Sequence, residues 1–496
     1  MVHRVVTDRG PVLAALIAAV CGAPSLALPF LSDDWVHVVT ASEGTILQTS
    51  FGFFRPLCNI SYWVDWRIWG QSPAPFHLTN VLLASLAAAL VVILARRYTG
   101  CPILAGLAGV LFALHPYHVG TVAWIAARSD LLSAVLVLLA AWAYDRWRER
   151  SGGLPLAALA LYEAAMLAKE SAVVLPGVLV VIGLLDARRR PTSVEWLRGL
   201  LPLLVVGLAH FALVRTTALG GISLNHLKWI GLWRGNLLSY GVTSVVPPPP
   251  EIFHQHPWPW GLVAVVIVGV LVVAGWLRTR RIPSVIWPAA AVFPVLLGPS
   301  LIGFQLRYFF LPGAVAMLAL AALLRGAGAR VGGGVAGILL AGWMATAAEQ
   351  WKGQFEAAAT SQRLLESLTM AGRGGDETIV AVAIPHRVHG VPVTTDYSRV
   401  ITFLSGRQVM VRTATEFDYP TGRADARAEG ADLRFAVERR PYSRLVLPLF
   451  PEGEDRVTEN WGTIVREGRD AARIQLHPSS EARFYVWQQG DLVPLR

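Results

Sequence analysis

The sequence predicts an all-α polytopic membrane protein of about 11 transmembrane helices, followed by a C-terminal extracytoplasmic α+β domain rich in strands. Three observations lead to this prediction. The chain is 54% hydrophobic and only 15% charged, against about 25% charged in an average soluble domain. Apolar runs recur as far as residue 349, and beyond Trp351 alternating apolar and polar residues replace them. This composition excludes an ordinary soluble enzyme.

About 11 apolar runs approach the length that crosses the ~30 Å hydrocarbon core of a bilayer. Two of them are short, so the number of spans could differ by one or two. The runs occupy residues 11–30, 77–95, 102–120, 131–145, 154–168, 171–186, 199–217, 259–277, 283–301, 308–324 and 331–348.

Arginine clusters between these runs predict the orientation. Clusters such as 96–97, 188–190 and 278–281 fall on alternate sides of successive runs, and basic loops remain cytoplasmic. The N-terminus is therefore predicted in the cytoplasm and the C-terminal domain outside it. Because these clusters carry much of the positive charge behind the net value of +10, we expect no nucleic-acid partner.

The segment 232–246 is largely apolar but lies between two stretches that must both be external. We expect an interfacial or re-entrant helix, ended by the prolines at 247–250.

The chain divides by composition into a transmembrane domain, residues 1–349, and a C-terminal domain, residues 350–496. In the second domain a short helix should precede strands, because apolar and polar residues alternate there. No catalytic signature is found in this domain. The expected strands are 378–384, 399–404, 407–412, 433–437, 443–449 and 483–487.

Ionisable residues gather in the predicted external loops, where their clustering indicates a functional site. The first loop contains Asp33, Asp34 and His37, and later Arg55. Adjacent carboxylates can accept a proton from an attacking hydroxyl or hold a divalent cation. The alternative is that they cap an interfacial helix.

The second external loop contains His115 and His118 at positions i and i+3, then Arg128 and Asp130. These side chains are candidates to contact a sugar, an acceptor or a metal ion. Ordinary interfacial histidines are the alternative.

Two further external turns carry cations suited to phosphate oxygens. Lys169 provides a point charge, with Glu170 as its orienting partner, and Arg307 beside Tyr308 provides a planar guanidinium. A salt bridge that closes a helical hairpin and an arginine that extends to lipid head groups are the respective alternatives.

These motifs resemble, in order and side, the membrane glycosyltransferases of the GT-C fold. The resemblance is to the transmembrane and tetratricopeptide O-mannosyltransferase group and its bacterial relatives, and covers about residues 25–320. It rests on DD, FRPL, FHLTN, LFALHPYHVGTVAWIAARSDLL, AKES and RYFFLP. It implies a polyprenyl-phosphate sugar donor, inversion at the anomeric carbon and an acid of the first loop as catalytic base, with Asp33 ranked above Asp34.

The chain departs from the family pattern at several positions. Gly120 stands where relatives often have Glu, Ser171 replaces Gln in the KEQ motif, and Leu306 replaces an acid before RY. The C-terminal domain has no tetratricopeptide repeats, which removes the best argument for a protein acceptor.

The resemblance thus implies an integral-membrane glycosyltransferase of a bacterial inner membrane. It would transfer a sugar, with mannose as one candidate, to a hydroxyl of a protein or glycan on the extracytoplasmic face. The cofactor is undetermined, with Mg or Mn as candidate cations. The alternatives are a transporter or flippase of a lipid-linked substrate, and a non-catalytic assembly factor of the GT-C fold.

Overall fold

The computed structural model divides the chain into two compact units. The first comprises Met1–Ala27 and Gly44–Trp351, and the second comprises Leu28–Glu43 and Lys352–Arg496. The structure describes all residues except 1, 48–52, 151–152, 186–191, 218–232, 250–256, 299–304, 374–377, 389–390, 394–395, 414–415, 420–422, 430–431, 439–455, 460–461, 468–470, 478–481, 489–490 and 496.

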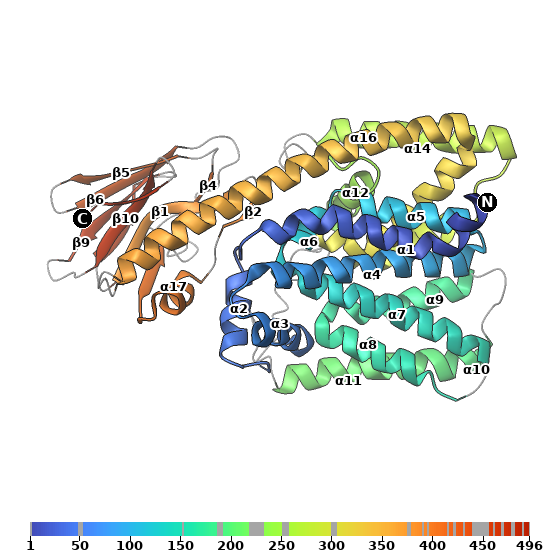
Figure 1. Cartoon of the computed structure of the whole chain (residues 1–496), viewed down its shortest axis with the longest axis horizontal. Helices are drawn as coiled ribbons and strands as arrows, with labels where there is room; N and C mark the ends of the chain where they lie inside the picture. The colour runs from blue at the N-terminus through green and yellow to red at the C-terminus, as the bar shows by residue number, and fades with distance from the viewer. Residues whose placement is uncertain are drawn as a thin grey trace. The chain divides into compact units, whose positions relative to one another are not determined.

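The first unit is built from helices, as expected (Figure 1). Each of the predicted apolar runs coincides largely with a helix. The longer elements are α1 (Val2–Gly22), α4 (Pro73–Thr99), α5 (Pro102–Leu114), α7 (Arg128–Arg150), α8 (Leu156–Ala168), α9 (Leu175–Leu185), α11 (Leu201–Thr217), α14 (Pro257–Thr279), α15 (Ile286–Leu297) and α16 (Phe310–Arg373).

Six helices among the described residues are long and apolar enough to cross a membrane, and four shorter apolar helices accompany them. The chain is therefore a multi-pass membrane protein, while the number of 11 spans stays a prediction. Helix α16 covers the last two predicted runs and continues to Arg373, so the short helix expected before the strands is instead the end of a long one. Its bend lies at Gly328, whose φ of 87° favours glycine.

Small residues bring the N-terminal helices together. Helix α4 packs against α1, α5 and α7, and α8 packs between α7 and α11 (Figure 1). Ala14, Ala88 and Ala105 are fully buried in this core, and a Cβ on Gly109 would lie 2.1 Å from Val92. Such close approach is common between membrane helices, where packing replaces the hydrophobic effect.

Shorter helices connect these elements. They are α3 (Pro56–Trp69), α6 (His118–Ala123), α10 (Ser193–Glu195) and the turns η1 (Ala23–Ala27), η2 (Ile125–Ala127), η3 (Glu170–Val174), η4 (Trp196–Leu200) and η7 (Leu306–Phe309). The segment predicted at 232–246 contains helix α12 (Trp233–Thr243), which ends before the prolines. Its interfacial position stays a prediction.

The second unit is the expected α+β domain, with two sheets. The larger has the order β11-β10-β1-β2, with β3 and β4 also pairing with β1, and the smaller has the order β5-β6-β9-β8-β7. The strands are β1 (Thr378–Val388), β2 (Val391–Pro392), β3 (Met410–Thr413), β4 (Glu416–Tyr419), β5 (Arg423–Glu429), β6 (Asp432–Glu438), β7 (Arg456–Glu459), β8 (Gly462–Arg466), β9 (Ala471–Leu476), β10 (Arg483–Gln488) and β11 (Asp491–Pro494).

Two details of this unit differ from the sequence analysis. The strand expected at 399–404 is wrong, because these residues lie in helix α17 (Tyr397–Ser405). The segment Leu28–Glu43, with helix α2 (Asp34–Ser42), groups with the second unit although it was assigned to the first domain. The strand expected at 443–449 lies outside the described residues.

Candidate functional site

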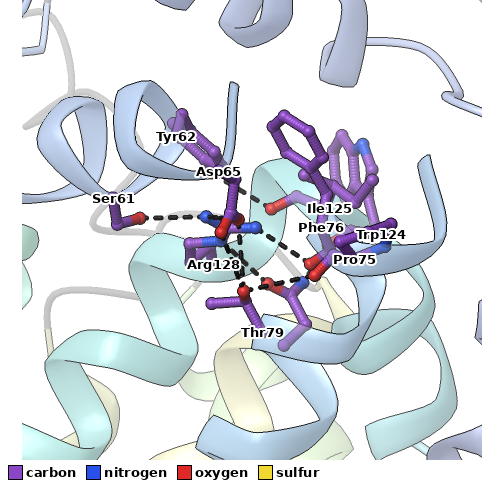
Figure 2. A network of polar contacts seen from close by, with 10 residues as sticks. Ser61, Tyr62, Asp65, Pro75, Phe76, Thr79, Trp124, Ile125 and Arg128 are labelled. Carbon is purple, nitrogen blue, oxygen red and sulfur yellow. Dashed lines mark hydrogen bonds and ion pairs between the residues drawn. The ribbon is translucent and has the colours of Figure 1, made fainter. Parts of the chain in front are cut away.

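Arg128 lies at the centre of a buried polar network (Figure 2). Its guanidinium forms an ion pair with Asp65 at 2.7 Å and donates to Asn80 Oδ1 at 3.1 Å. It also donates to Ser61 Oγ at 3.0 Å and to the Phe76 carbonyl at 2.9 Å. Because its side chain is 0% exposed and its donors are occupied, Arg128 holds α3, α4 and α7 together.

The FHLTN motif supplies much of this network. Thr79 donates to Asp65 at 3.2 Å, and the Asn80 amide donates to the Trp124 carbonyl at 3.0 Å. The ring of Tyr62 lies 4.4 Å from the Arg128 guanidinium. Asp65 was not among the residues predicted for the site, since its only mark in the sequence is its place in the first external loop between two tryptophans.

Arg55 and Glu170 form a two-point ion pair that joins the FRPL and AKES motifs. The Arg55 Nε–Glu170 Oε2 distance is 3.0 Å, and the Nη2–Oε1 distance is 2.7 Å. Burial raises the pKa of Glu170, but the charge and hydrogen bonds of Arg55, the charge of Lys169 and a backbone hydrogen bond together hold the pKa below its ordinary value. Glu170 was expected to orient Lys169, whereas in the structure it pairs with Arg55.

Lys169 instead forms an ion pair with Asp130. Its ammonium also lies 4.8 Å from the centre of the Tyr308 ring. One oxygen of Asp130, Oδ2, is buried and has no hydrogen-bond partner among the described residues. The structure thus brings together three residues that sequence analysis placed in three different external turns.

Arg307, in the turn η7, lies against the same Tyr308 ring as Lys169. Its guanidinium lies 4.7 Å from the Trp124 ring and 5.3 Å from the Tyr308 ring. Its Nε is buried without a hydrogen-bond partner, and no described carboxylate lies within ion-pair distance of it. The Tyr308 ring therefore contacts two cations, of which only Lys169 has a counter-charge in the described chain.

The charges in this cluster do not cancel. Arg55, Arg128, Lys169 and Arg307 stand against three carboxylates, those of Glu170, Asp65 and Asp130, in the described part of the chain. One positive charge is left over, and it belongs to Arg307. A half-buried cation held between aromatic rings favours an anionic ligand, since the rings orient the guanidinium without neutralising it.

The two histidines of the second loop are packed as core residues. His115 Nε2 lies 3.2 Å from the Thr243 carbonyl oxygen, and its ring packs against Phe309 and Trp343. The His118 ring packs against Phe112 and Phe310. Among the described residues no group of three or more His, Cys, Asp or Glu could hold a metal ion.

Asp33 and Asp34, in the second unit, differ in environment. Asp34 is 0% exposed, and its Oδ2 accepts a hydrogen bond from the Leu31 amide at 2.9 Å. Asp33 is partly exposed and precedes α2 without capping it through its side chain. His37 is half-buried on the same helix. Helix capping therefore does not account for Asp33.

Comparison with known proteins supports the resemblance drawn from the motifs. The chain is 36% identical over 180 residues to the protein O-mannosyl-transferase Tmtc1 of Drosophila melanogaster, which covers 36% of the chain and 20% of Tmtc1. It is 37% identical over 190 residues to Tmtc2 of the same organism, covering 37% and 19%. It is also 32% identical over 180 residues to human TMTC1, covering 33% and 19%. The resemblance to this group is confirmed.

The matched region spans about a fifth of the length of these relatives. No family model matches the chain. Among solved structures, the crystal structure of ArnT from Cupriavidus metallidurans bound to undecaprenyl phosphate aligns with a TM-score of 0.36 at 16% identity, covering 81% of this chain and 85% of ArnT. A TM-score this low supports no assignment.

Proposed function

We propose that this protein is an integral-membrane glycosyltransferase that transfers a sugar from a polyprenyl-phosphate donor to an acceptor hydroxyl, with inversion. The observation that carries the proposal is the charge of Arg307, which no described carboxylate neutralises, next to that of Lys169, with both cations against the ring of Tyr308. A phosphodiester carries one negative charge, which matches the positive charge left over in the cluster. The relatives are named protein O-mannosyl-transferases, which supports the transfer of a sugar.

The proposed reaction is a single displacement. The acceptor oxygen attacks the anomeric carbon while the bond from that carbon to the phosphate oxygen breaks, and the lipid phosphate leaves with the bonding electrons. Asp33 takes the proton of the acceptor hydroxyl, and Arg307 with Lys169 stabilises the charge that develops on the phosphate. Mannose is the candidate sugar and a protein or glycan the candidate acceptor. Release of free polyprenyl phosphate by the purified protein tests the proposal.

The proposed catalytic face is extracytoplasmic, at the inner membrane of a bacterium, with the N-terminus in the cytoplasm. The arginine clusters support this orientation. A reporter enzyme fused after residue 350 should be active only outside the cytoplasm, and one fused after Arg190 only inside. A cytoplasmic signal from the first fusion would reverse the topology and place the candidate site on the wrong face for this proposal.

One observation favours the alternative of a lipid-linked-substrate transporter. Glu163 Oε1 on α8 lies 2.8 Å from His210 Nδ1 on α11, and both residues fall within predicted spans. Ionisable groups at membrane depth often mark transport paths. Movement of an intact sugar lipid across the bilayer, without loss of its sugar, would favour this function over transfer.

A further inference from the structure

The segment Leu28–Glu43, which carries Asp33, belongs with Lys352–Arg496 to the second unit, called the C-terminal unit below. Leu31 is 3% exposed and belongs to the hydrophobic core that this unit forms with its sheets, and Trp35 packs against the same core. Helix α2 contacts helix α17. Leu31 and Trp35, two places before and two places after Asp33, therefore depend on the C-terminal unit for their positions.

A backbone hydrogen bond holds the turn directly before Asp33. The Ser32 amide donates to the Val393 carbonyl at 3.0 Å, and Ser361 Oγ on α16 donates to the same oxygen at 2.8 Å. Ser32 has a φ of 53°, which a non-glycine residue rarely adopts. Such backbone strain persists only where the surroundings hold it, and it is concentrated at functional sites.

An ion pair holds the other end of α2. Arg399 Nη2, on α17, lies 2.6 Å from Glu43 Oε2, directly after the last residue of α2. Helix α2 is thus attached at its start through Leu31 and Ser32, and at its end through Glu43. Both attachments are made by residues of the C-terminal domain, 350–496, whose sequence carries no catalytic signature.

We infer that the C-terminal unit positions the Asp33 carboxylate for the transfer reaction, so that Leu31, Glu43 and Arg399 are positioning residues. The inference rests on the proposed function, and it gives the C-terminal domain a role in turnover. A displacement of about 1 Å in a catalytic group can cost on the order of 100-fold in rate. Loosening either attachment should therefore lower kcat. KM for the donor should stay unchanged, because Arg307 and Lys169, the side chains proposed to bind the donor phosphate, lie in the first unit.

A charge swap tests this without disturbing the core. Arg399→Glu places two like charges together at the end of α2 and should lower kcat about tenfold. The double variant Arg399→Glu with Glu43→Arg restores opposite charges and should return kcat to within about twofold of the wild type. Hydrogen exchange of the α2 amides should rise in the single variant and recover in the double variant.

Arg434→Glu is the matched control, because Arg434, on strand β6 of the smaller sheet, forms a 2.8 Å ion pair with Glu467. This variant should leave both kcat and the hydrogen exchange of the α2 amides unchanged. An Arg399→Glu variant with faster α2 exchange but normal kcat would overturn the inference, and so would an equal loss in Arg434→Glu. Absence of transfer by the wild type would overturn the proposed function and this inference with it.

Discussion

Asp33→Asn lowers kcat by about 100-fold or more in our account, since positioned general bases typically contribute roughly 10²- to 10⁴-fold. Asparagine keeps the size of the side chain but cannot accept the proton. Asp34→Asn should cost much less, because its amide oxygen can still accept the hydrogen bond from the Leu31 amide. The measurement is sugar transfer by purified protein, with thermal unfolding as the check on folding.

The comparison separates proton acceptance from a structural role, since asparagine keeps the size and most of the hydrogen bonding of aspartate. If both variants are folded and turn over normally, the two carboxylates are structural and the base assignment is wrong. A larger loss in Asp34→Asn than in Asp33→Asn would exchange their roles.

Arg307→Ala should lower kcat/KM about 30- to 1000-fold. Loss of a charged hydrogen bond to a phosphate in a site shielded from water costs roughly 2–4 kcal/mol in the transition state. Arg307→Lys should recover part of the activity, because the charge remains while the planar contact with Trp124 and Tyr308 is lost.

Arg278→Ala is the matched control. Arg278 is an exposed arginine at the end of α14 that donates to the Arg325 carbonyl at 3.2 Å, in a loop predicted to be cytoplasmic. It should retain near-normal activity. Equal losses in the two variants would mean that Arg307 stabilises the fold and does not bind the donor.

The helices of the membrane unit could be predicted because apolar runs of this length are decided by local composition. The prediction of a strand at 399–404 was wrong because these residues fit both the two-residue period of a strand and the 3.6-residue period of a helix. Tyr397, Val400 and Ile401 are buried at positions i, i+3 and i+4 of α17, and this helical spacing was obscured by apparent alternation in the same short segment. The bend at Gly328 is visible in the sequence only as one glycine among several.

The motifs that contribute to the candidate site could be predicted from the sequence, but not which of their side chains form ion pairs with each other. Lys169 and Glu170 are adjacent in sequence, which suggested that they pair, yet neighbouring residues do not face each other. Their partners Asp130 and Arg55 lie 39 and 115 residues away. Arg128 looked like a ligand-binding residue until the structure placed Asp65 against it.

Donor turnover by the full-length protein in lipid nanodiscs decides whether it is a glycosyltransferase. A polyprenyl-phosphate sugar, mannose first, is supplied with peptide and glycan acceptors, and mass spectrometry quantifies free polyprenyl phosphate and glycosylated acceptor. We expect the two products to appear in equal amounts, with inverted anomeric configuration in the new bond, and Asp33→Asn to abolish both. A donor that stays intact with folded wild-type protein, across the panel of sugars and acceptors, would contradict it.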